Sequence, residues 1–269
     1  MKIVVCVKQV PATGDAKIDP ETKRIVREGS KAVINPFDLY ALEEAVRIKE
    51  QVGGEVIALS MGPESAKSVL VESLSMGADR AVLLCDRAFG GSDTWATSYA
   101  LARGIEAIGP VDLIICGKQA IDGDTAQVGV GIAAKLGLQQ AANVQRIEKL
   151  EADAVTVSRL NERGWDVVKL RLPALLTVNK DINVPRVPTL RSARIAHKAE
   201  IPLWTPADIG AELDKIGLKS SPTQVVKAAP PAPRDVETIH MDGAAPETAG
   251  LFVDEMLRRG LLEGRRDRA

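Results

Sequence analysis

The chain contains the stretch Gly117-Lys118-Gln119-Ala120-Ile121-Asp122-Gly123-Asp124-Thr125-Ala126-Gln127-Val128-Gly129, which lies between two apolar segments. The run Asp112–Cys116 before it predicts a buried parallel strand, and Val130–Leu136 after it predicts a helix. Small and hydroxyl side chains at such a turn allow the backbone to approach a phosphate, and the helix N-terminus supplies unpaired N–H groups. We therefore expect a nucleotide at the carboxyl edge of a parallel sheet. The two loop acids, Asp122 and Asp124, are expected to cap the helix or to meet a ribose or water.

The preceding residues repeat this alternation of strand and helix. Asn35 is expected to cap the first helix, with Pro36 at its first position. Four alternations at about 30-residue spacing predict a doubly wound, mostly parallel α/β sheet. The strands are expected at residues 2–8, 55–60, 81–85 and 113–117, and the helices at 36–51, 63–76, 94–108 and 130–136.

The pattern changes after residue 145. Alternating segments at 155–159 and 166–172 predict an inserted antiparallel β-hairpin, and 173–178 predicts a strand that returns to the sheet. A smaller hairpin is expected within Pro11–Lys31.

From residue 183 onward the chain is rich in proline and has little apolar periodicity. We therefore expect a nucleotide- or flavin-binding α/β domain at 1–182 and an extended C-terminal arm at 183–269. The arm is expected to wrap a partner subunit, the alternative being a disordered tail. A short amphipathic helix is expected near Val253–Leu261.

The composition argues against several classes of function. The 269 residues carry a net charge of −1, which gives no electrostatic reason for binding nucleic acid or a membrane surface. We expect no signal sequence and no membrane insertion, because no apolar run has the required length. The three cysteines lie far apart in predicted strands and form no C-x-x-C pair, so they predict small buried side chains in a reducing cytoplasm rather than a zinc or iron–sulfur centre.

No nucleophile–base constellation is visible, and no P-loop or G-x-G-x-x-G turn follows the first strand. The unusual loops all follow predicted strands, at the edge where open α/β sheets bind ligands. The hydroxyls of Thr94, Thr97 and Ser98 fall within one helical turn. They could hydrogen-bond the polar edge of a flavin, or else cap the helix and face solvent.

Five motifs follow one another along the chain. They are Val7-Lys8-Gln9-Val10-Pro11, Asn35-Pro36-Phe37-Asp38, Ser60-Met61-Gly62-Pro63, Met76-Gly77-Ala78-Asp79 and the stretch 117–129. Together, and in this order, they resemble the beta subunits of electron transfer flavoproteins, and the resemblance covers essentially the whole chain. It implies a fold like that of the adenine-nucleotide alpha hydrolases, a heterodimer with an alpha subunit, and an arm that embraces that subunit.

The resemblance brings two cofactors into consideration. Mitochondrial-type beta subunits hold AMP as a structural ligand, whereas electron-bifurcating ones hold a second FAD in the same pocket. Residues 122–129 and 86–98 resemble the bifurcating group, so FAD is expected, with AMP as the alternative; Trp95 departs from the smaller aliphatic residue expected there. The cofactor is expected to contact Cys6, Val7, Lys8, Asn35, Pro36, Phe37, Asp38, Met61, Gly62, Gly90, Asp93, Thr94, Thr97, Lys118, Gln119, Ala120, Ile121, Asp122, Gly123, Asp124, Thr125, Ala126, Gln127, Val128 and Gly129.

The resemblance also implies a recognition loop that docks an acyl-CoA dehydrogenase. Residues 187–195 align with this loop, and Leu190 would be its anchor, with partner contacts from Arg191, Arg194 and Ile195. The alternative is that Leu190 packs on its own subunit.

The implied function is that of an electron carrier subunit whose FAD accepts a hydride from NADH near Thr94 and Thr97. One electron would pass through the alpha-subunit FAD to the acyl-CoA dehydrogenase, and the other to ferredoxin or flavodoxin. One alternative is a non-bifurcating shuttle subunit that holds AMP. Another is an adenylating or ATP-hydrolysing enzyme of related fold.

Overall fold

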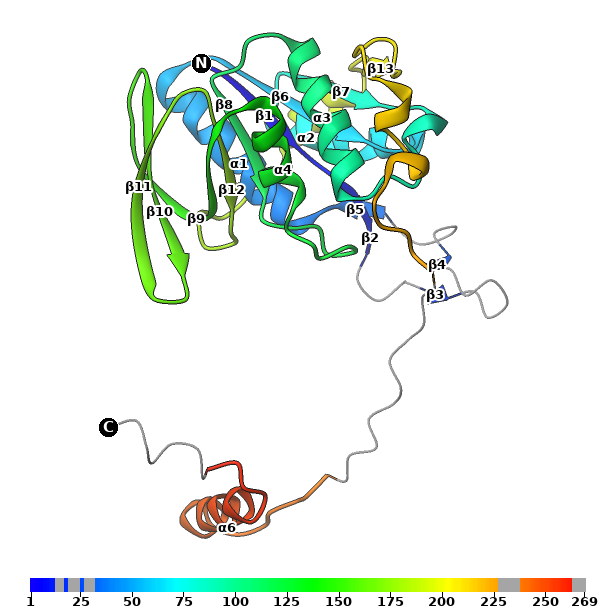
Figure 1. Ribbon diagram of the computed structural model, residues 1–269. Helices are drawn as coiled ribbons and strands as arrows, with labels where there is room; N and C mark the ends of the chain where they lie inside the picture. Colours follow the sequence, from blue (N-terminus) through cyan, green and yellow to red (C-terminus); the bar gives the residue numbers. More distant parts are fainter. Residues whose placement is uncertain (13–16, 19–24, 27–31, 227–237, 263–269) are drawn as a thin grey trace. The chain divides into compact units, whose positions relative to one another are not determined.

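The computed structural model describes residues 1–12, 17–18, 25–26, 32–226 and 238–262 (Figure 1). The chain divides into two compact units, Met1–Ala228 and Ala229–Ala269. The described part of the first unit contains a nine-stranded sheet in the order β11-β10-β9-β12-β8-β1-β6-β7-β13. Its strands are β1 (Lys2–Cys6), β6 (Glu55–Met61), β7 (Arg80–Leu84), β8 (Leu113–Gly117), β9 (Gln139–Leu150), β10 (Ala154–Asn161), β11 (Gly164–Arg171), β12 (Ala174–Val178) and β13 (Leu203–Trp204).

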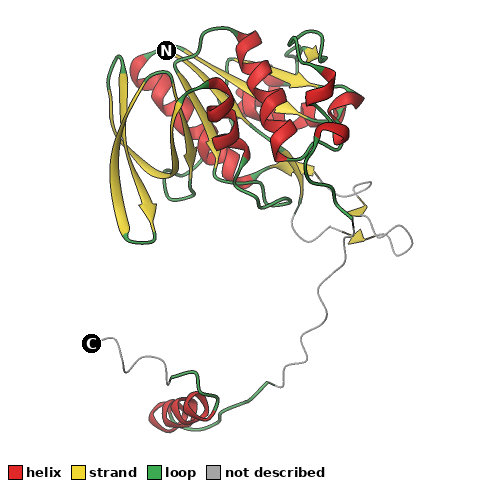
Figure 2. Ribbon diagram, viewed as in Figure 1, coloured by secondary structure: helices red, strands yellow, loops and turns green. Residues whose placement is uncertain are grey.

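The strands from β9 to β13 in this order are mutually parallel, and the direction of winding changes at β1, which lies between β8 and β6. Helices cover both faces of the sheet (Figure 2). The helices α1 (Pro36–Val52) and α2 (Lys67–Met76) pack on one face, and α3 (Thr94–Ile108) and α4 (Val128–Leu136) pack on the other. The predicted doubly wound α/β fold is therefore confirmed.

The alternation of side chains along β1 explains why its residues are uniformly apolar. Ile3 and Val5 enter the core beneath α1 and α2, whereas Val4 enters the core beneath α3 and α4. All three are fully buried, as are Leu113, Ile114 and Ile115 of β8. A strand covered on both faces shows no polar alternation, which is why the continuous runs of the sequence predicted it.

The inserted hairpin is present, but it has a third strand that the sequence pattern did not reveal. Strands β10 and β11 pair antiparallel, with Asn161 opposite Gly164 at the turn. Strand β9 pairs antiparallel with β10 and parallel with β12, and it begins at Gln139, before the expected alternation. Its first residues are polar or small, so their extended conformation comes from pairing with β12 rather than from local propensity.

The first unit extends beyond the domain boundary predicted at residue 182. Strand β13 pairs with β7 at the edge of the sheet, and Ala196, Ile209 and Ile216 are buried. Single apolar side chains therefore anchor this proline-rich segment to the sheet and to α3. Because they do not recur at regular intervals, the sequence pattern placed the domain boundary too early. The short α5 (Leu190–Ala196) and the 3₁₀ turns Glu64–Ala66, Arg87–Phe89, Leu213–Lys215 and Leu218–Ser220 complete this unit.

Two short antiparallel pairs follow β1 in the sequence. Strand β2 (Gln9–Pro11) pairs with β5 (Ala32–Ile34). Within the predicted small hairpin, β3 (Lys17–Ile18) pairs with β4 (Ile25–Val26). The other residues of that hairpin, 13–16, 19–24 and 27–31, lie outside the described part of the chain.

The second unit contains α6 (Ala245–Arg258), which begins earlier than the helix expected near residues 253–261. None of its residues is buried, and Leu251, Phe252, Val253 and Leu257 are exposed. The predicted role of this arm in wrapping a partner stays a prediction. Of the helices in the described ranges, none combines the length and the apolar character needed to cross a bilayer.

A glycine determines how closely α3 and α4 pack. A Cβ added at Gly131 of α4 would lie 2.4 Å from Oγ and 2.9 Å from Cβ of Ser98 on α3. Gly131→Ala is therefore expected to reduce the free energy of unfolding by about 1–3 kcal/mol, although alanine favours a helix more than glycine does.

Urea denaturation of the purified protein measures this change. Gly250→Ala, in α6, is the matched control because nothing lies within 4 Å of its added Cβ. Equal stability of the two variants would contradict the close packing of α3 against α4.

Candidate functional site

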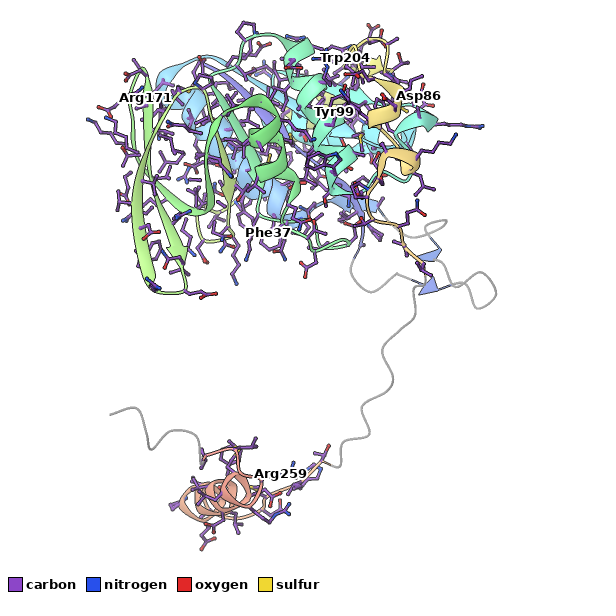
Figure 3. The ribbon with its side chains drawn as sticks, in the orientation of Figure 1. Phe37, Asp86, Tyr99, Arg171, Trp204 and Arg259 are labelled. Carbon is purple, nitrogen blue, oxygen red and sulfur yellow. The ribbon has the colours of Figure 1, made fainter. Side chains whose placement is uncertain are left out.

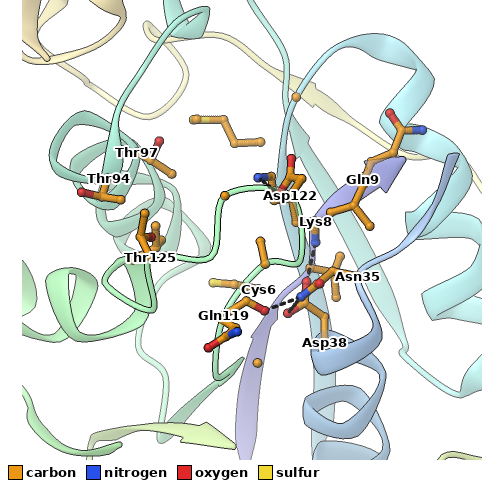
Figure 4. Close-up of a pocket in the computed structure, with 18 of the residues that line it drawn as sticks. Cys6, Lys8, Gln9, Asn35, Asp38, Thr94, Thr97, Gln119, Asp122 and Thr125 are labelled. Carbon is orange, nitrogen blue, oxygen red and sulfur yellow. Dashed lines mark hydrogen bonds and ion pairs between the residues drawn. The ribbon is translucent and has the colours of Figure 1, made fainter. Parts of the chain in front are cut away.

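A cavity of about 680 Å³ opens at the carboxyl ends of β1, β6 and β8 (Figure 4). This volume lies within the range of roughly 300–1,000 Å³ that is usual for small-molecule and cofactor sites. Loops that are far apart in the sequence converge here, as expected for the edge at which the winding of the sheet changes direction. Of the residues predicted to contact a cofactor, all line the cavity except Pro36, Phe37, Gly90 and Ile121.

Thirteen further residues line the cavity that were not predicted to contact the cofactor. Most of them belong to the quoted motifs or to the stretch 86–98, where the sequence did not distinguish them from their neighbours. For the others, Ala32, Ser65, Ala66, Leu101 and Cys116, the position in the sequence relative to a motif was the only signal available. The thirteen residues are Gln9, Val10, Pro11, Ala32, Pro63, Ser65, Ala66, Phe89, Gly91, Ser92, Leu101, Cys116 and Gly117.

Asp38 and Asn35 form a buried polar pair at the base of the cavity. Nδ2 of Asn35 donates to Oδ1 of Asp38 at 2.9 Å, and the backbone N–H of Lys8 donates to Oδ2 at 2.8 Å. Gly117 allows the carboxylate to approach β8, since an added Cβ would lie 2.3 Å from Oδ1 of Asp38. One carboxylate thus joins the end of β1 to the start of α1.

Asn35 does not act as the predicted helix cap. Its side chain makes no capping bond to α1. Instead, Nδ2 donates to the carbonyl of Gln119 at 2.9 Å, and Oδ1 accepts the N–H of Ile121 at 3.1 Å. The amide satisfies the backbone of the 118–127 loop, which has no strand or helix to do so. Asn35 therefore fixes the loop, and Ile121 takes part through its backbone although its side chain does not line the cavity.

Burial is the main influence on the ionisation of Asp38. It raises the pKa of this carboxyl from 3.8 to about 7, and the hydrogen bonds from Asn35 and Lys8 oppose the rise. The group can therefore change its charge near neutral pH inside the cavity.

The loop acids do not have the predicted capping role either. Oδ1 of Asp122 accepts a hydrogen bond from Nζ of Lys8 at 2.6 Å, an ion pair that connects the 118–127 loop to the segment after β1 (Figure 4). Asp124 accepts a hydrogen bond from Nε2 of Gln119. Both acids are held by other parts of the protein, and neither caps α4.

The backbone of this loop is strained. Asp124 and Ala126 have φ values of 54° each, in the left-handed region that residues with a side chain rarely adopt. Such conformations cost on the order of 1 kcal/mol or more each and concentrate at ligand sites. The bonds from Lys8, Asn35 and Gln119 hold the loop in this form.

The N-terminus of α4 opens into the cavity without a side-chain cap. Gln127 occupies the capping position and makes no capping bond, and Gln127, Val128 and Gly129 all line the cavity. The first N–H groups of a helix have no partner within it and carry a partial positive charge. This end of α4 can therefore bind an anionic group such as a phosphate.

The N-terminus of α3 is arranged differently. Oδ1 of Asp93 accepts the N–H groups of Trp95 and Ala96 at 2.9 and 3.1 Å, so Asp93 is the cap. Thr94 and Thr97 line the cavity, and Oγ1 of Thr94 donates to Oε1 of Gln127 at 3.1 Å. Ser98 bonds instead to the carbonyls of Thr94 and Val128, between the helices. Two of the three predicted hydroxyls thus face the cavity.

Two thiols line the inner wall of the cavity. Cys6 and Cys116 are neighbours in register on the parallel strands β1 and β8. The adjacent Cys6 thiol, burial and the nearby Asp38 all raise the pKa of the Cys116 thiol, so it stays protonated. The side chain of Cys116 therefore offers a soft, uncharged surface. Within the described ranges no three His, Cys, Asp or Glu side chains gather as a metal site would require.

The predicted recognition segment lies away from the cavity. Leu190 begins α5 with 93% of its surface exposed, and Arg191, Arg194 and Ile195 are also exposed. Arg186 precedes the segment, and its guanidinium bonds both Glu43 and Glu50 of α1. Leu190 therefore points into solvent rather than packing on its own subunit, and the ion pairs of Arg186 fix the segment that precedes it.

Comparison with known proteins assigns the chain to a family model. Residues 22–209 match the model of the electron transfer flavoprotein domain. The chain is 47% identical to the electron transfer flavoprotein subunit beta of Thermoanaerobacterium thermosaccharolyticum, over 86% of this chain and 88% of that protein. It is 45% identical to subunit CarD of the caffeyl-CoA reductase–Etf complex of Acetobacterium woodii, over 97% and 100%. It is 43% identical to protein FixA of Azorhizobium caulinodans, over 96% and 95%.

Asp38→Asn is expected to change how stability depends on pH. Because burial raises the pKa of Asp38 to about 7, the folded chain holds one proton more than the unfolded chain between about pH 4 and 7. The contribution of this group to stability is therefore full below about pH 4 and declines as the pH rises to 7. Urea denaturation at a series of pH values measures this decline in the free energy of unfolding, which should be absent from the variant.

At pH 5 the same variant should be less stable than the wild type by about 1–3 kcal/mol. Its amide N–H groups would have to face either Nδ2 of Asn35 or the N–H of Lys8, which are both donors. Asp214→Asn, at an exposed position, controls for the loss of one carboxylate. An unchanged pH slope in Asp38→Asn would show that Asp38 does not carry the extra proton.

Proposed function

This chain belongs to the electron transfer flavoprotein family as a beta subunit, and we propose that its cavity holds FAD and that it carries electrons as part of a heterodimer with an alpha subunit. The observation that carries the proposal is the arrangement at the sheet edge. An uncapped helix N-terminus, a buried polar pair and two threonine hydroxyls surround one cavity of about 680 Å³.

The chemistry of the lining suits the parts of FAD in turn. The open N–H groups at the start of α4 suit the pyrophosphate. The segment formed by Cys6, Asn35, Asp38 and Met61 suits the adenosine, since it offers apolar surface beside amide and carboxylate groups. Thr94 and Thr97 lie on the opposite wall (Figure 4), where their hydroxyls can bond the polar edge of the isoalloxazine.

FAD, when bound, supplies the ability to take a hydride and release electrons singly. The residues of this chain bind and orient it, and Lys8 with Asp122 closes one side of the cavity. We propose NADH as the hydride donor, with one electron passing through the alpha-subunit FAD to an acyl-CoA dehydrogenase and the other to ferredoxin or flavodoxin. The name of the CarD relative, which belongs to a CoA-thioester reductase complex, supports this class of partner.

An AMP-holding shuttle subunit is the second candidate, because the α4 N-terminus and the Asn35–Asp38 pair suffice for a mononucleotide. Bound AMP would leave the wall formed by Thr94 and Thr97 without a ligand, although this wall belongs to the same cavity. FAD reaches both walls and is therefore preferred. A cytoplasmic location, based on the unpaired cysteines, is part of the same proposal.

Counting the nucleotides released from the denatured heterodimer tests the cofactor directly. We expect two FAD and no AMP per heterodimer. Thr97→Val should weaken binding of the flavin in this chain or shift its reduction potential, because a methyl replaces a hydroxyl at the cavity wall. One FAD with one AMP would instead establish the shuttle.

Thr156→Val, on the inserted hairpin, is the matched control for the threonine substitution. If Thr97→Val and Thr156→Val give the same flavin affinity and redox titration as the wild type, Thr97 has no contact with the flavin.

Leu190→Ala is expected to weaken docking of the acyl-CoA dehydrogenase by about 2 kcal/mol, roughly 30-fold in Kd, because an exposed apolar anchor of this kind typically fills a partner pocket. Binding of the purified dehydrogenase to the intact heterodimer measures the effect. Leu213→Ala, another exposed leucine, is the control. Equal affinities for both variants would remove Leu190 from the interface.

A further inference from the structure

A strap made by residues 217–223 lies against the loop that precedes α3. The N–H of Gly217 donates to Oγ of Ser92 at 3.0 Å, and the N–H of Leu218 donates to the carbonyl of Gly90 at 3.2 Å. Nearby, the hydroxyl of Tyr99 on α3, labelled in Figure 3, accepts the N–H of Glu212 at 3.2 Å. The strap therefore follows the wall of the cavity from outside, since Gly91, Ser92 and Asp93 line the cavity.

Asp93 connects the strap to α3 through both of its carboxylate oxygens. Oδ1 caps the helix at the amides of Trp95 and Ala96. Oδ2 accepts the N–H of Thr223 at 3.0 Å and its Oγ1–H at 2.9 Å. The N–H of Asp93 also donates to Oγ of the buried Ser221 at 2.8 Å. One residue thus determines the position of Thr94 and anchors the end of the strap.

The charge of Asp93 suits this double role. Although partial desolvation opposes it, the hydrogen bonds from Ala96, Thr223 and Trp95 lower the pKa of this carboxyl. Hydrogen bonds to an ionised acceptor are stronger than those between neutral groups.

Thr223 is also the last described residue of the first unit that hydrogen-bonds to another part of it. Val225 and Val226 are 88% and 97% exposed, and the second unit begins at Ala229. The end of the strap is therefore fixed at Thr223, through the carboxylate that also caps α3.

We propose that Asp93 is a positioning residue that couples the strap to the nucleotide cavity. The inference rests on the proposed function, in that the cavity holds a nucleotide against Thr94 and Thr97. A ligand that orders the start of α3 strengthens the hold of Asp93 on Thr223. Because coupling between two sites is reciprocal, release of the strap weakens the ligand by the same factor.

Amide hydrogen exchange and nucleotide titration of the full heterodimer test the coupling, with FAD and, in parallel, AMP as the probes. In the wild type, the bound nucleotide should slow exchange at Thr223. In Thr223→Val, exchange at Trp95 and Ala96 should rise about threefold to tenfold, and the Kd of the nucleotide should rise by a similar factor, as expected for one lost hydrogen bond to a charged group.

Two further variants separate coupling from folding. Asp93→Asn keeps an oxygen that can cap α3 but presents N–H groups to the two donors of Thr223, so it should reproduce the effect of Thr223→Val on Kd. Ser220→Ala is the control, because its hydroxyl bonds only the carbonyl of Gly217 within the strap. It should leave both measurements unchanged.

The outcomes are distinguishable from those of the proposed function. Binding of AMP but not FAD would overturn the flavin assignment and leave the coupling to be judged with AMP. The coupling itself is overturned if the nucleotide that binds leaves exchange at Thr223 unchanged, or if Thr223→Val and Asp93→Asn bind it as tightly as Ser220→Ala does.

Discussion

The candidate site depends on the hydrogen bonds that the buried carboxyl group of Asp38 accepts. This group accepts hydrogen bonds from Lys8 and Asn35, and Asn35 in turn holds the backbone of Gln119 and Ile121. The ends of two strands and the start of α1 are therefore tied to one buried group. The arrangement has a cost, since burial raises the pKa of this carboxyl to about 7. In the same arrangement, the carboxyl holds Asn35, which satisfies loop backbone groups that would otherwise lack partners.

Once this base is fixed, two helix N-termini face one cavity with opposite electrostatic character. The start of α4 is left uncapped and attracts an anion. The start of α3 is already occupied by the carboxylate of Asp93, so it repels a phosphate and offers only the hydroxyls of Thr94 and Thr97. An elongated ligand with an anionic middle and an uncharged, polar-edged end can therefore bind in one direction only. The direction of binding therefore follows from one difference, namely that Asp93 caps α3 whereas no side chain caps α4.

The sequence predicted those features that depend on local chemistry. The bounds of α3 and β8 agree with prediction to the residue, since a strong cap and a glycine mark the ends of α3 and β8 is apolar throughout. Features that depend on distant partners were missed. Asn35 looked like a helix cap but bonds a loop 84 residues away. Strand β9 and the anchoring of Ile209 likewise come from tertiary pairing and burial. The left-handed conformation of Ala126 carries no sequence signal, and that of Asp124 carries only the general tolerance of aspartate for this region.

In the second unit, the described residues 238–262 contain a helix but no buried side chain. Helix α6 has 14 residues and buries none of them, although Leu251, Phe252, Val253 and Leu257 are apolar. Isolated helices of this length are marginal in water, since packing of an apolar face supplies most helical stability. Wrapping of an alpha subunit, with which beta subunits of this family pair, stays a prediction for α6, and it would give these apolar side chains a surface to pack on. The position of Thr223, in contrast, is determined within the first unit, because the carboxylate of Asp93 accepts both its N–H and its hydroxyl.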